Sequence, residues 1–267
     1  MDFPILSLET YIDFFKKKWY NLYIKNEGGK TEMATYAFTD LHGNYNIWQQ
    51  IKDYIQEDDM VIYLGDAIDR GNRGFEIFIE LLADDRIVYL RGNHEQMMYD
   101  AWFNRHADAF NHWMRNGGQE TINNINKLNW SIEEKDEIIR MVTDLPYQVE
   151  YVNPMGYKIQ LTHAGYTPNE SWDKLEDHEK KYRLLWSRAH FFDDWPICND
   201  IIIHGHTPVQ YMIGKGVLET YNNSSLKLEY SQGHKICIDM GTYSSNAAIL
   251  FNLDTLRVQK IFYDTNN

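Results

Sequence analysis

Short apolar runs, each followed by a polar cluster, recur along the chain and predict its architecture. The runs have the length of strands and are rich in Ile, Val, Leu and Tyr, which is typical of strands buried on both faces. Two stretches with helical patterning, residues 46–55 and 74–84, separate the first three runs. This alternation of strand, loop and helix predicts an α/β fold built in layers. The segments are ATYAFTDLHGN (34–44), MVIYLGDAIDRG (60–71), RIVYLRGNHE (86–95), YKIQLTHAG (157–165) and DIIIHGHTP (200–208).

The polar clusters all follow the carboxyl ends of the predicted strands, and each contains glycine. In layered α/β folds, ligands bind in the loops beyond these strand ends, and glycine lets the backbone turn sharply and approach closely there. A single Asp or His at a strand end is usually a cap or a satisfied polar group. Because the clusters share one position in the fold, we expect them to form one site.

The stretch from about residue 96 to 146 has helical rather than strand patterning. Its first part ends at Gly117 and Gly118, a helix stop, and a later part opens with Ser131 and Glu134 in capping-box spacing. We expect a helical insertion beside the site, with its aromatic stripe in the core. The apolar positions at helical spacing are Met97, Trp102, Phe110 and Trp113.

Residues 1–32 are separated from the rest by NEGGKTEM, a segment typical of a flexible joint. We expect a helical N-terminal extension that packs on the domain or on a partner. The remaining residues, 33–267, are expected to form one domain that includes the insertion.

Composition narrows the protein class. The chain of 267 residues is 43% hydrophobic and has no apolar run near the roughly 20 residues of a membrane span. Its N-terminus places acid before lysines, the reverse of a secretory signal, which predicts a cytoplasmic protein. A formal net charge of −13 argues against a general binder of nucleic acid or anionic membranes. Cys198 and Cys237 stand beside isoleucines and are expected to be buried thiols.

The clusters together supply a mixed set of oxygen and nitrogen ligands. Such a set suits divalent transition metals such as Mn, Fe, Zn or Co better than Mg or Ca. It is too large for one ion with an open position, and it suits two ions that share a bridging carboxylate. The candidate ligands are Asp40, His42, Asp66, Asn93, His163 and His206.

The motifs DLHG, GDAIDRG, RGNHE, THAG and GHTP, in this order, resemble those of the calcineurin-like metallophosphoesterases. The full forms of GDAIDRG and RGNHE resemble the phosphoprotein phosphatase branch, and the likeness spans about residues 36–241. The resemblance implies a central β-sandwich of mixed sheets flanked by helices. It also implies two divalent transition-metal ions, most often Mn, with Fe, Zn, Co or Ni as alternatives.

The resemblance also implies a role for each motif residue. One metal would be held by Asp40, His42 and the bridging Asp66, and the other by Asp66, Asn93, His163 and His206. A hydroxide that bridges the two cations would attack phosphorus in line, because bound water loses its proton far more readily than bulk water.

A proton donor and three arginines complete the implied site. His94 would protonate the leaving group, with Asp69 as its partner. Arg70, Arg91 and Arg188 would bind the phosphoryl oxygens. Two simpler interpretations stay open: Asp69 and Arg70 can form a local salt bridge, and Arg188 can pair with an acid.

The leading functional hypothesis is a serine/threonine protein phosphatase, with dual specificity possible. The alternative is a dinucleoside polyphosphate hydrolase, in which aromatic side chains would stack on bases. A third hypothesis is a catalytically silent, metal-stabilised adaptor, although such a protein has no need of the His94–Asp69 pair. Aromatic residues available for stacking are Trp102, Trp113, Trp186, Phe191, Phe192 and Trp195.

Overall fold

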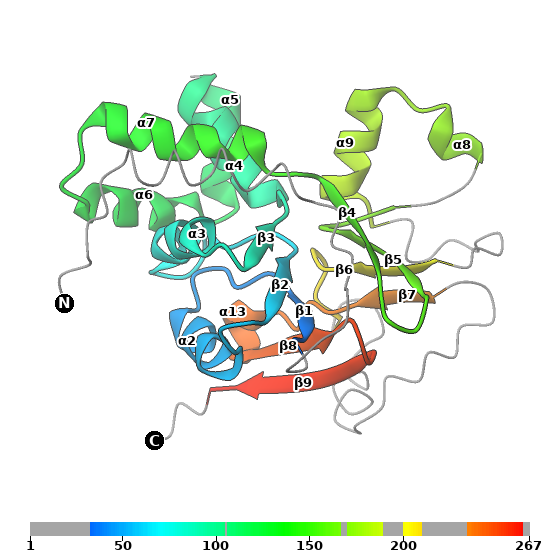
Figure 1. The fold of residues 1–267 in the computed structure, drawn as a ribbon. Coiled ribbons are helices and arrows are strands. Elements are labelled where there is room, and N and C mark those ends of the chain that lie inside the picture. Colours follow the sequence, from blue (N-terminus) through cyan, green and yellow to red (C-terminus); the bar gives the residue numbers. More distant parts are fainter. Residues whose placement is uncertain (1–32, 105, 167–169, 189–199, 210–233, 264–267) are drawn as a thin grey trace.

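The chain folds as two β-sheets that share a hydrophobic core, with helices around them (Figure 1). This confirms the expected α/β fold with mixed sheets flanked by helices. The predicted N-terminal extension, residues 1–32, lies outside the described residues. The computed structural model describes residues 33–104, 106–166, 170–188, 200–209 and 234–263.

Both sheets combine parallel and antiparallel strands. The first has the order β3-β2-β1-β8-β9, in which β1, β2 and β3 are parallel and β8 and β9 are added antiparallel. The second has the order β4-β5-β6-β7, with only β4 antiparallel to its neighbour. The strands are β1 (Thr35–Phe38), β2 (Met60–Tyr63), β3 (Ile87–Tyr89), β4 (Gln148–Val152), β5 (Lys158–Thr162), β6 (Ile201–His204), β7 (His234–Cys237), β8 (Ala247–Asn252) and β9 (Arg257–Phe262).

Side chains of the first sheet alternate between two cores. In β2, Val61 and Tyr63 pack in the core on the helical side, whereas Ile62 packs in the core shared with the second sheet. Both faces are covered, and this explains the continuous apolar runs in the sequence. Cys237 is buried in the shared core, as predicted, and Cys198 lies outside the described residues.

The helices surround the sheets. The predicted helices at 46–55 and 74–84 correspond to α2 and α3, and α2 begins where the Asn44 side chain accepts a hydrogen bond from the Ile47 amide. In Figure 1, α4 to α7 gather on the side of the first sheet, and α8 and α9 lie on the side of the second. The helices are α2 (Tyr45–Tyr54), α3 (Gly74–Ala83), α4 (Asn93–Phe103), α5 (Ala107–Arg115), α6 (Gly118–Lys127), α7 (Ile132–Arg140), η2 (Met141–Asp144), α8 (Glu170–Asp173), α9 (Asp177–Trp186) and α13 (Thr242–Ser245).

The helices after β3 follow the local signals of the sequence. The predicted capping box of Ser131 and Glu134 opens α7, and Gly117, with φ of 100°, separates α5 from α6. The aromatic stripe is core only in part, because Trp113 is buried whereas Phe110 is 44% exposed.

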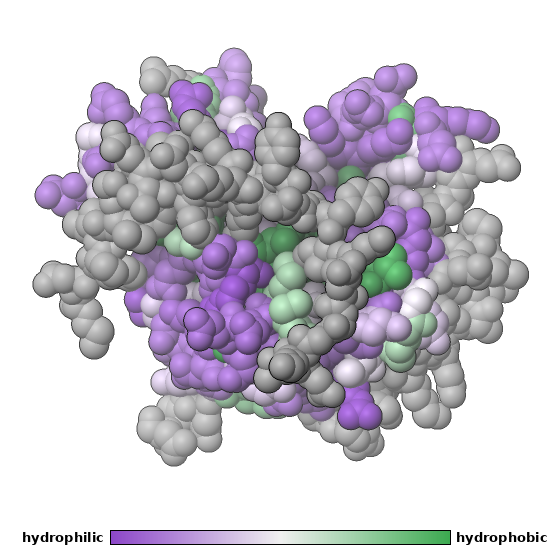
Figure 2. Space-filling model, viewed as in Figure 1, coloured by the Kyte–Doolittle hydropathy of each residue, from purple (hydrophilic) through white to green (hydrophobic). Residues whose placement is uncertain are grey.

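The described surface is largely polar on the face drawn in Figure 2, where hydrophilic side chains predominate among the coloured residues. None of the helices in the described ranges is long and apolar enough to cross a membrane.

Candidate active site

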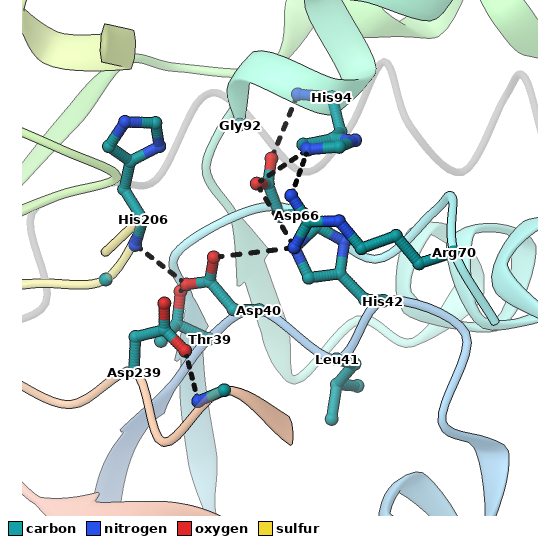
Figure 3. Close-up of polar contacts among 12 residues, drawn as sticks. Thr39, Asp40, Leu41, His42, Asp66, Arg70, Gly92, His94, His206 and Asp239 are labelled. Carbon is teal, nitrogen blue, oxygen red and sulfur yellow. Dashed lines mark hydrogen bonds and ion pairs between the residues drawn. The ribbon is translucent and has the colours of Figure 1, made fainter. Parts of the chain in front are cut away.

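The fold brings the polar clusters together, as the sequence predicts. Asp40 and His42 follow β1, Asp66 follows β2, and Asn93 opens α4 after β3. The second sheet supplies the other two ligand candidates: His163 directly follows β5, and His206 follows β6. Figure 3 shows Asp40, Asp66, His42 and His94 turned toward one another, with His206 on the far side of Asp40.

Backbone strain is concentrated in these loops. Of the eight non-glycine residues with left-handed φ in the described part of the chain, six are candidate site residues. Such conformations persist where the surrounding structure holds them, and they cluster at functional sites. These six are Asp40, His42, Asp66, Asp69, Arg70 and His206.

Two motif glycines leave space for the carboxylates. A Cβ atom on Gly92 would overlap Oδ1 of Asp66, and one on Gly205 would overlap Oδ2 of Asp40. The glycines therefore allow the backbone of neighbouring loops to approach both acids closely.

The ligand atoms converge around two oxygens, Oδ1 of Asn93 and Oδ2 of Asp66. Oδ1 of Asn93 is 2.8 Å from Nε2 of His163 and 2.9 Å from Nδ1 of His206. Oδ2 of Asp66 is 3.4 Å from Nε2 of His163 and 3.7 Å from Nε2 of His42. Asp66 thus lies between the ligands of the two sheets, the position required of a bridging carboxylate.

Backbone carbonyls orient two of the imidazoles. Nδ1 of His42 lies 2.9 Å from the Ile68 carbonyl, and Nδ1 of His163 lies 2.8 Å from the Leu64 carbonyl. In each ring, Nδ1 carries the proton, so Nε2 presents a lone pair toward Asp66.

One buried polar atom fits a metal. Oδ1 of Asp40 has no hydrogen-bond partner, although Asp40 is buried beside His42 and Asp66. The other oxygen of Asp40 accepts hydrogen bonds from the Thr39 hydroxyl and the His206 amide, which fixes the carboxylate with Oδ1 3.9 Å from Nε2 of His42. Buried polar groups are normally paired, so a cation is the partner that this arrangement lacks.

The charges of the site favour the same conclusion. Burial keeps the pKa of His42 and of His206 well below the ordinary value, which leaves both imidazoles in the neutral form that binds metals. Burial also raises the pKa of Asp66, and the nearby charge of Asp40 raises it further. Cations would relieve this repulsion.

A buried pair stands beside the ligand set. Nδ1 of His94 is 2.6 Å from Oδ2 of Asp69. Asp69 also accepts hydrogen bonds from the indole of Trp113 and the hydroxyl of Thr121. Burial raises the pKa of Asp69 to about 7, while these two hydrogen bonds oppose the shift. The pair can orient His94 for proton transfer.

The three candidate arginines lie in different environments. Nη1 of Arg70 is 2.7 Å from Nε2 of His42, and its Nη2 is 3.1 Å from Nε2 of His94, so Arg70 lies inside the site. Arg70 forms no ion pair with Asp69 among the described residues, and thus the local salt bridge is not observed. Arg188 is exposed; burial lowers the pKa of His163, and the charge of Arg188 adds a smaller lowering.

Arg91 is held away from solvent. Its Nη1 atom donates to Oε1 of Gln96 and to the hydroxyl of Tyr147, and its guanidinium lies 4.4 Å from the centre of the Tyr147 ring. Nε of Arg91 is buried without a partner. The structure therefore does not bring Arg91 together with the ligand set as it does Arg70.

Sequence reasoning missed several buried residues around the site. Glu95 accepts from the amides of Asp66, Ala67 and Gly92 and from the Tyr89 hydroxyl, so it braces two neighbouring loops. Its place in RGNHE was the available signal. Other missed residues are Asp239, which lies near Asp40 in Figure 3, and the partners of Asp69, namely Trp113 and Thr121.

Comparisons with known proteins agree with this geometry. The model of the family described as calcineurin-like phosphoesterase matches residues 33–238. Serine/threonine-protein phosphatase 1 of Salmonella typhimurium is 26% identical over 178 residues, which cover 64% of this chain and 77% of that protein.

Two solved structures share the fold. One, a candidate diadenosine tetraphosphatase, superposes with a TM-score of 0.55 at 12% identity and covers 90% of this chain and 97% of its own. The other, the cold-active protein-tyrosine phosphatase of a psychrophilic Shewanella species, has a TM-score of 0.52 at 14% identity and covers 86% and 78%. With its family model matched over most of its length, the chain belongs to the calcineurin-like phosphoesterases, a family of metal-dependent hydrolases.

Proposed function

We propose that this protein is a two-metal phosphomonoesterase that removes phosphate from phosphoproteins, with phosphoserine and phosphothreonine as first substrates. The observation that carries the proposal is the buried ligand set, in which Oδ1 of Asp40 lacks a partner and Asn93 lies against His163 and His206, beside the His94–Asp69 pair. The relative of this chain from Salmonella typhimurium is named as a serine/threonine-protein phosphatase, which supports the choice of substrate.

The proposed metal sites share Asp66. Asp40 and His42 complete the first set, and Asn93, His163 and His206 complete the second. Manganese is the first choice, with iron, zinc, cobalt or nickel as alternatives, because the set mixes carboxylate, amide and imidazole. When bound, the ions supply an activated water nucleophile and offset the charge of the phosphoryl oxygens.

His94 is the proposed proton donor. As the bond between phosphorus and the leaving oxygen breaks, His94 gives its proton to that oxygen, and Asp69 keeps the ring in place through Nδ1. Burial holds the pKa of His94 well below its ordinary value, and a dianionic phosphoryl group in the site opposes this shift because it favours the charged imidazolium.

Arg70 is the proposed clamp for the phosphoryl oxygens. A metal on Nε2 of His42 would use the lone pair that Arg70 now contacts, so the guanidinium becomes available to the substrate. Arg188 is proposed to assist from the exposed side. Arg91 must first leave Tyr147 and Gln96, and we assign it the smaller part.

Dinucleoside polyphosphate hydrolysis is the second candidate. Trp186 favours it, because its ring lies 6.3 Å from the ring of His206 and can stack on a base beside the site. A phosphoseryl peptide and diadenosine tetraphosphate, each assayed with Mn at matched concentration, separate the candidates. We expect a higher kcat/KM for the peptide. A strong preference for the dinucleotide would refute the first choice, and hydrolysis of neither would favour the adaptor.

A further inference from the structure

The Asp69 carboxylate is surrounded by donors from three helices. Nδ1 of His94, in α4, lies 2.6 Å from Oδ2 of Asp69, and Oγ1 of Thr121, in α6, lies 2.6 Å from Oδ1. Nε1 of Trp113 of α5 donates to both oxygens, at 3.0 and 2.9 Å. All four side chains are almost completely buried, so water does not compete for the carboxylate.

The Thr121 hydroxyl is fixed at both ends. Its oxygen accepts a hydrogen bond from the Asp69 amide at 3.0 Å, so its proton remains available for Oδ1 of Asp69. The Thr121 hydroxyl thereby orients both the backbone amide and the carboxylate of Asp69. The backbone of Asp69 is left-handed, with φ of 69°.

The turn between α5 and α6 places both donors. The carbonyl of Gly117 accepts from the Arg70 amide at 3.2 Å, which ties the turn to the loop that carries Asp69. A Cβ atom on Gly118 would overlap the Trp113 ring, so this glycine allows the indole to lie against the start of α6. The turn thus places Trp113 of α5 and Thr121 of α6 where both can donate to the Asp69 carboxylate.

We propose that Trp113 and Thr121 are positioning residues for proton transfer, which hold the Asp69 carboxylate in the orientation that keeps Nε2 of His94 toward the substrate. The inference rests on the proposed role of His94 and adds two residues that act through Asp69. It also gives the helices α5 and α6 a part in the reaction.

The charges around Asp69 define the expected pH effect. The titratable or charged groups that face it are His94 of α4 and Arg70 of its own loop, and α5 and α6 present the uncharged Trp113 and Thr121. His112 of α5 acts on the other member of the pair, because burial, and then nearby charges that include His112, lower the pKa of His94. Burial raises the pKa of Asp69 to about 7, and the bonds from Thr121 and Trp113 lower it. Without either bond the pKa rises, Asp69 stays protonated to higher pH, and the acid limb of the rate profile moves upward.

The test uses substitutions that keep shape and remove one donor. Thr121→Val and Trp113→Phe should each lower kcat on a phosphoseryl peptide about tenfold or more, with a smaller loss on p-nitrophenyl phosphate, whose leaving group needs little protonation. Their acid limbs should move to higher pH with KM little changed. Thr121→Ser restores the hydroxyl and should recover most of the loss.

Trp102→Phe is the matched control. Trp102 lies eight positions after His94 in α4, and its indole also donates to a carboxylate, that of Asp136 in α7. This variant loses the same kind of hydrogen bond and should keep the wild-type pH profile.

A second measurement does not depend on turnover. In the zinc-loaded protein, the Nδ1 proton of His94 should give a low-field NMR signal that moves upfield or broadens in Thr121→Val and Trp113→Phe, and stays in Trp102→Phe. If His94→Ala lowers kcat equally on the phosphoseryl peptide and on p-nitrophenyl phosphate, the proposed role of His94 as the acid is refuted. The NMR signal would still show whether Trp113 and Thr121 position the His94–Asp69 pair. An unchanged signal and pH profile in both Thr121→Val and Trp113→Phe would overturn the inference.

Discussion

The proposed metal side and the proposed proton-donor side of this site are built in different ways. The metal side draws each ligand candidate from the end of a β-strand, where a parallel sheet collects loops at one edge. The proton-donor side depends on α5 and α6, whose Trp113 and Thr121 reach back to Asp69. The strand ends bring together the residues proposed to bind metal ions, whereas α5 and α6 supply the hydrogen bonds that orient the Asp69 carboxylate.

The two sides also use buried acids differently. Asp66 has an oxygen that faces imidazole nitrogens, and the charge of Asp40 opposes its ionisation, a repulsion that bound cations would relieve. Asp69 is satisfied by hydrogen bonds from protein side chains alone. Loss of metal should therefore disturb the first side and leave the second largely intact.

The largest effect that separates the two sides is expected from His94→Ala. A general acid contributes about 10²–10⁴-fold, so kcat on a phosphoseryl peptide should fall by that order, with a smaller loss on p-nitrophenyl phosphate. Metal content, measured by elemental analysis, should stay near that of wild type. Because Nε2 of His94 is 3.8 Å from Oδ2 of Asp66, loss of metal in this variant would mean that His94 is a ligand and not the acid.

Glu95→Gln tests the support of the metal side. The carboxylate accepts from three backbone amides and from Tyr89, and a Gln amide nitrogen cannot accept any of these bonds. Partners that orient ligands typically contribute about 10–100-fold to metal affinity, and we expect a loss in this range by metal titration. Unchanged affinity would show that the Asp66 loop does not depend on Glu95.

The smallest expected effect is the difference in kcat/KM between Arg70→Ala and Arg91→Ala. Arg70 lies against His42 and His94, whereas Arg91 is bonded to Gln96 and Tyr147. Hydrogen bonds to charged groups contribute about 1.5–3 kcal/mol, so Arg70→Ala should lower kcat/KM roughly tenfold or more, and Arg91→Ala by less. The same chemical change at both positions serves as the internal control. A larger loss for Arg91→Ala would show that its guanidinium leaves Tyr147 to bind substrate.

The metal side could be predicted from the sequence because its information is local. Each ligand candidate follows an apolar run within a few positions, and the glycine beside it marks the close approach of the backbone. The first two helices could be predicted for the same reason, whereas the mixed sheets were implied only by the resemblance to a known family.

The proton-donor side could not be predicted because its contacts span long separations. Trp113 and Thr121 lie 44 and 52 positions from Asp69, and helical spacing indicated only that Trp113 is a core residue. Arg91 shows the same limit, since its motif suggested a phosphate ligand, yet its guanidinium bonds to Tyr147, 56 positions away.

The central claim is that the buried ligand set holds two metal ions that support hydrolysis. Elemental analysis of wild type and Asp66→Asn, paired with p-nitrophenyl phosphate hydrolysis with and without added Mn, tests it most directly. The account predicts two transition-metal ions per chain and Mn-dependent hydrolysis in wild type, with both reduced in Asp66→Asn because the bridging carboxylate is lost. One ion or none in wild type, with no hydrolysis under any metal, would contradict it.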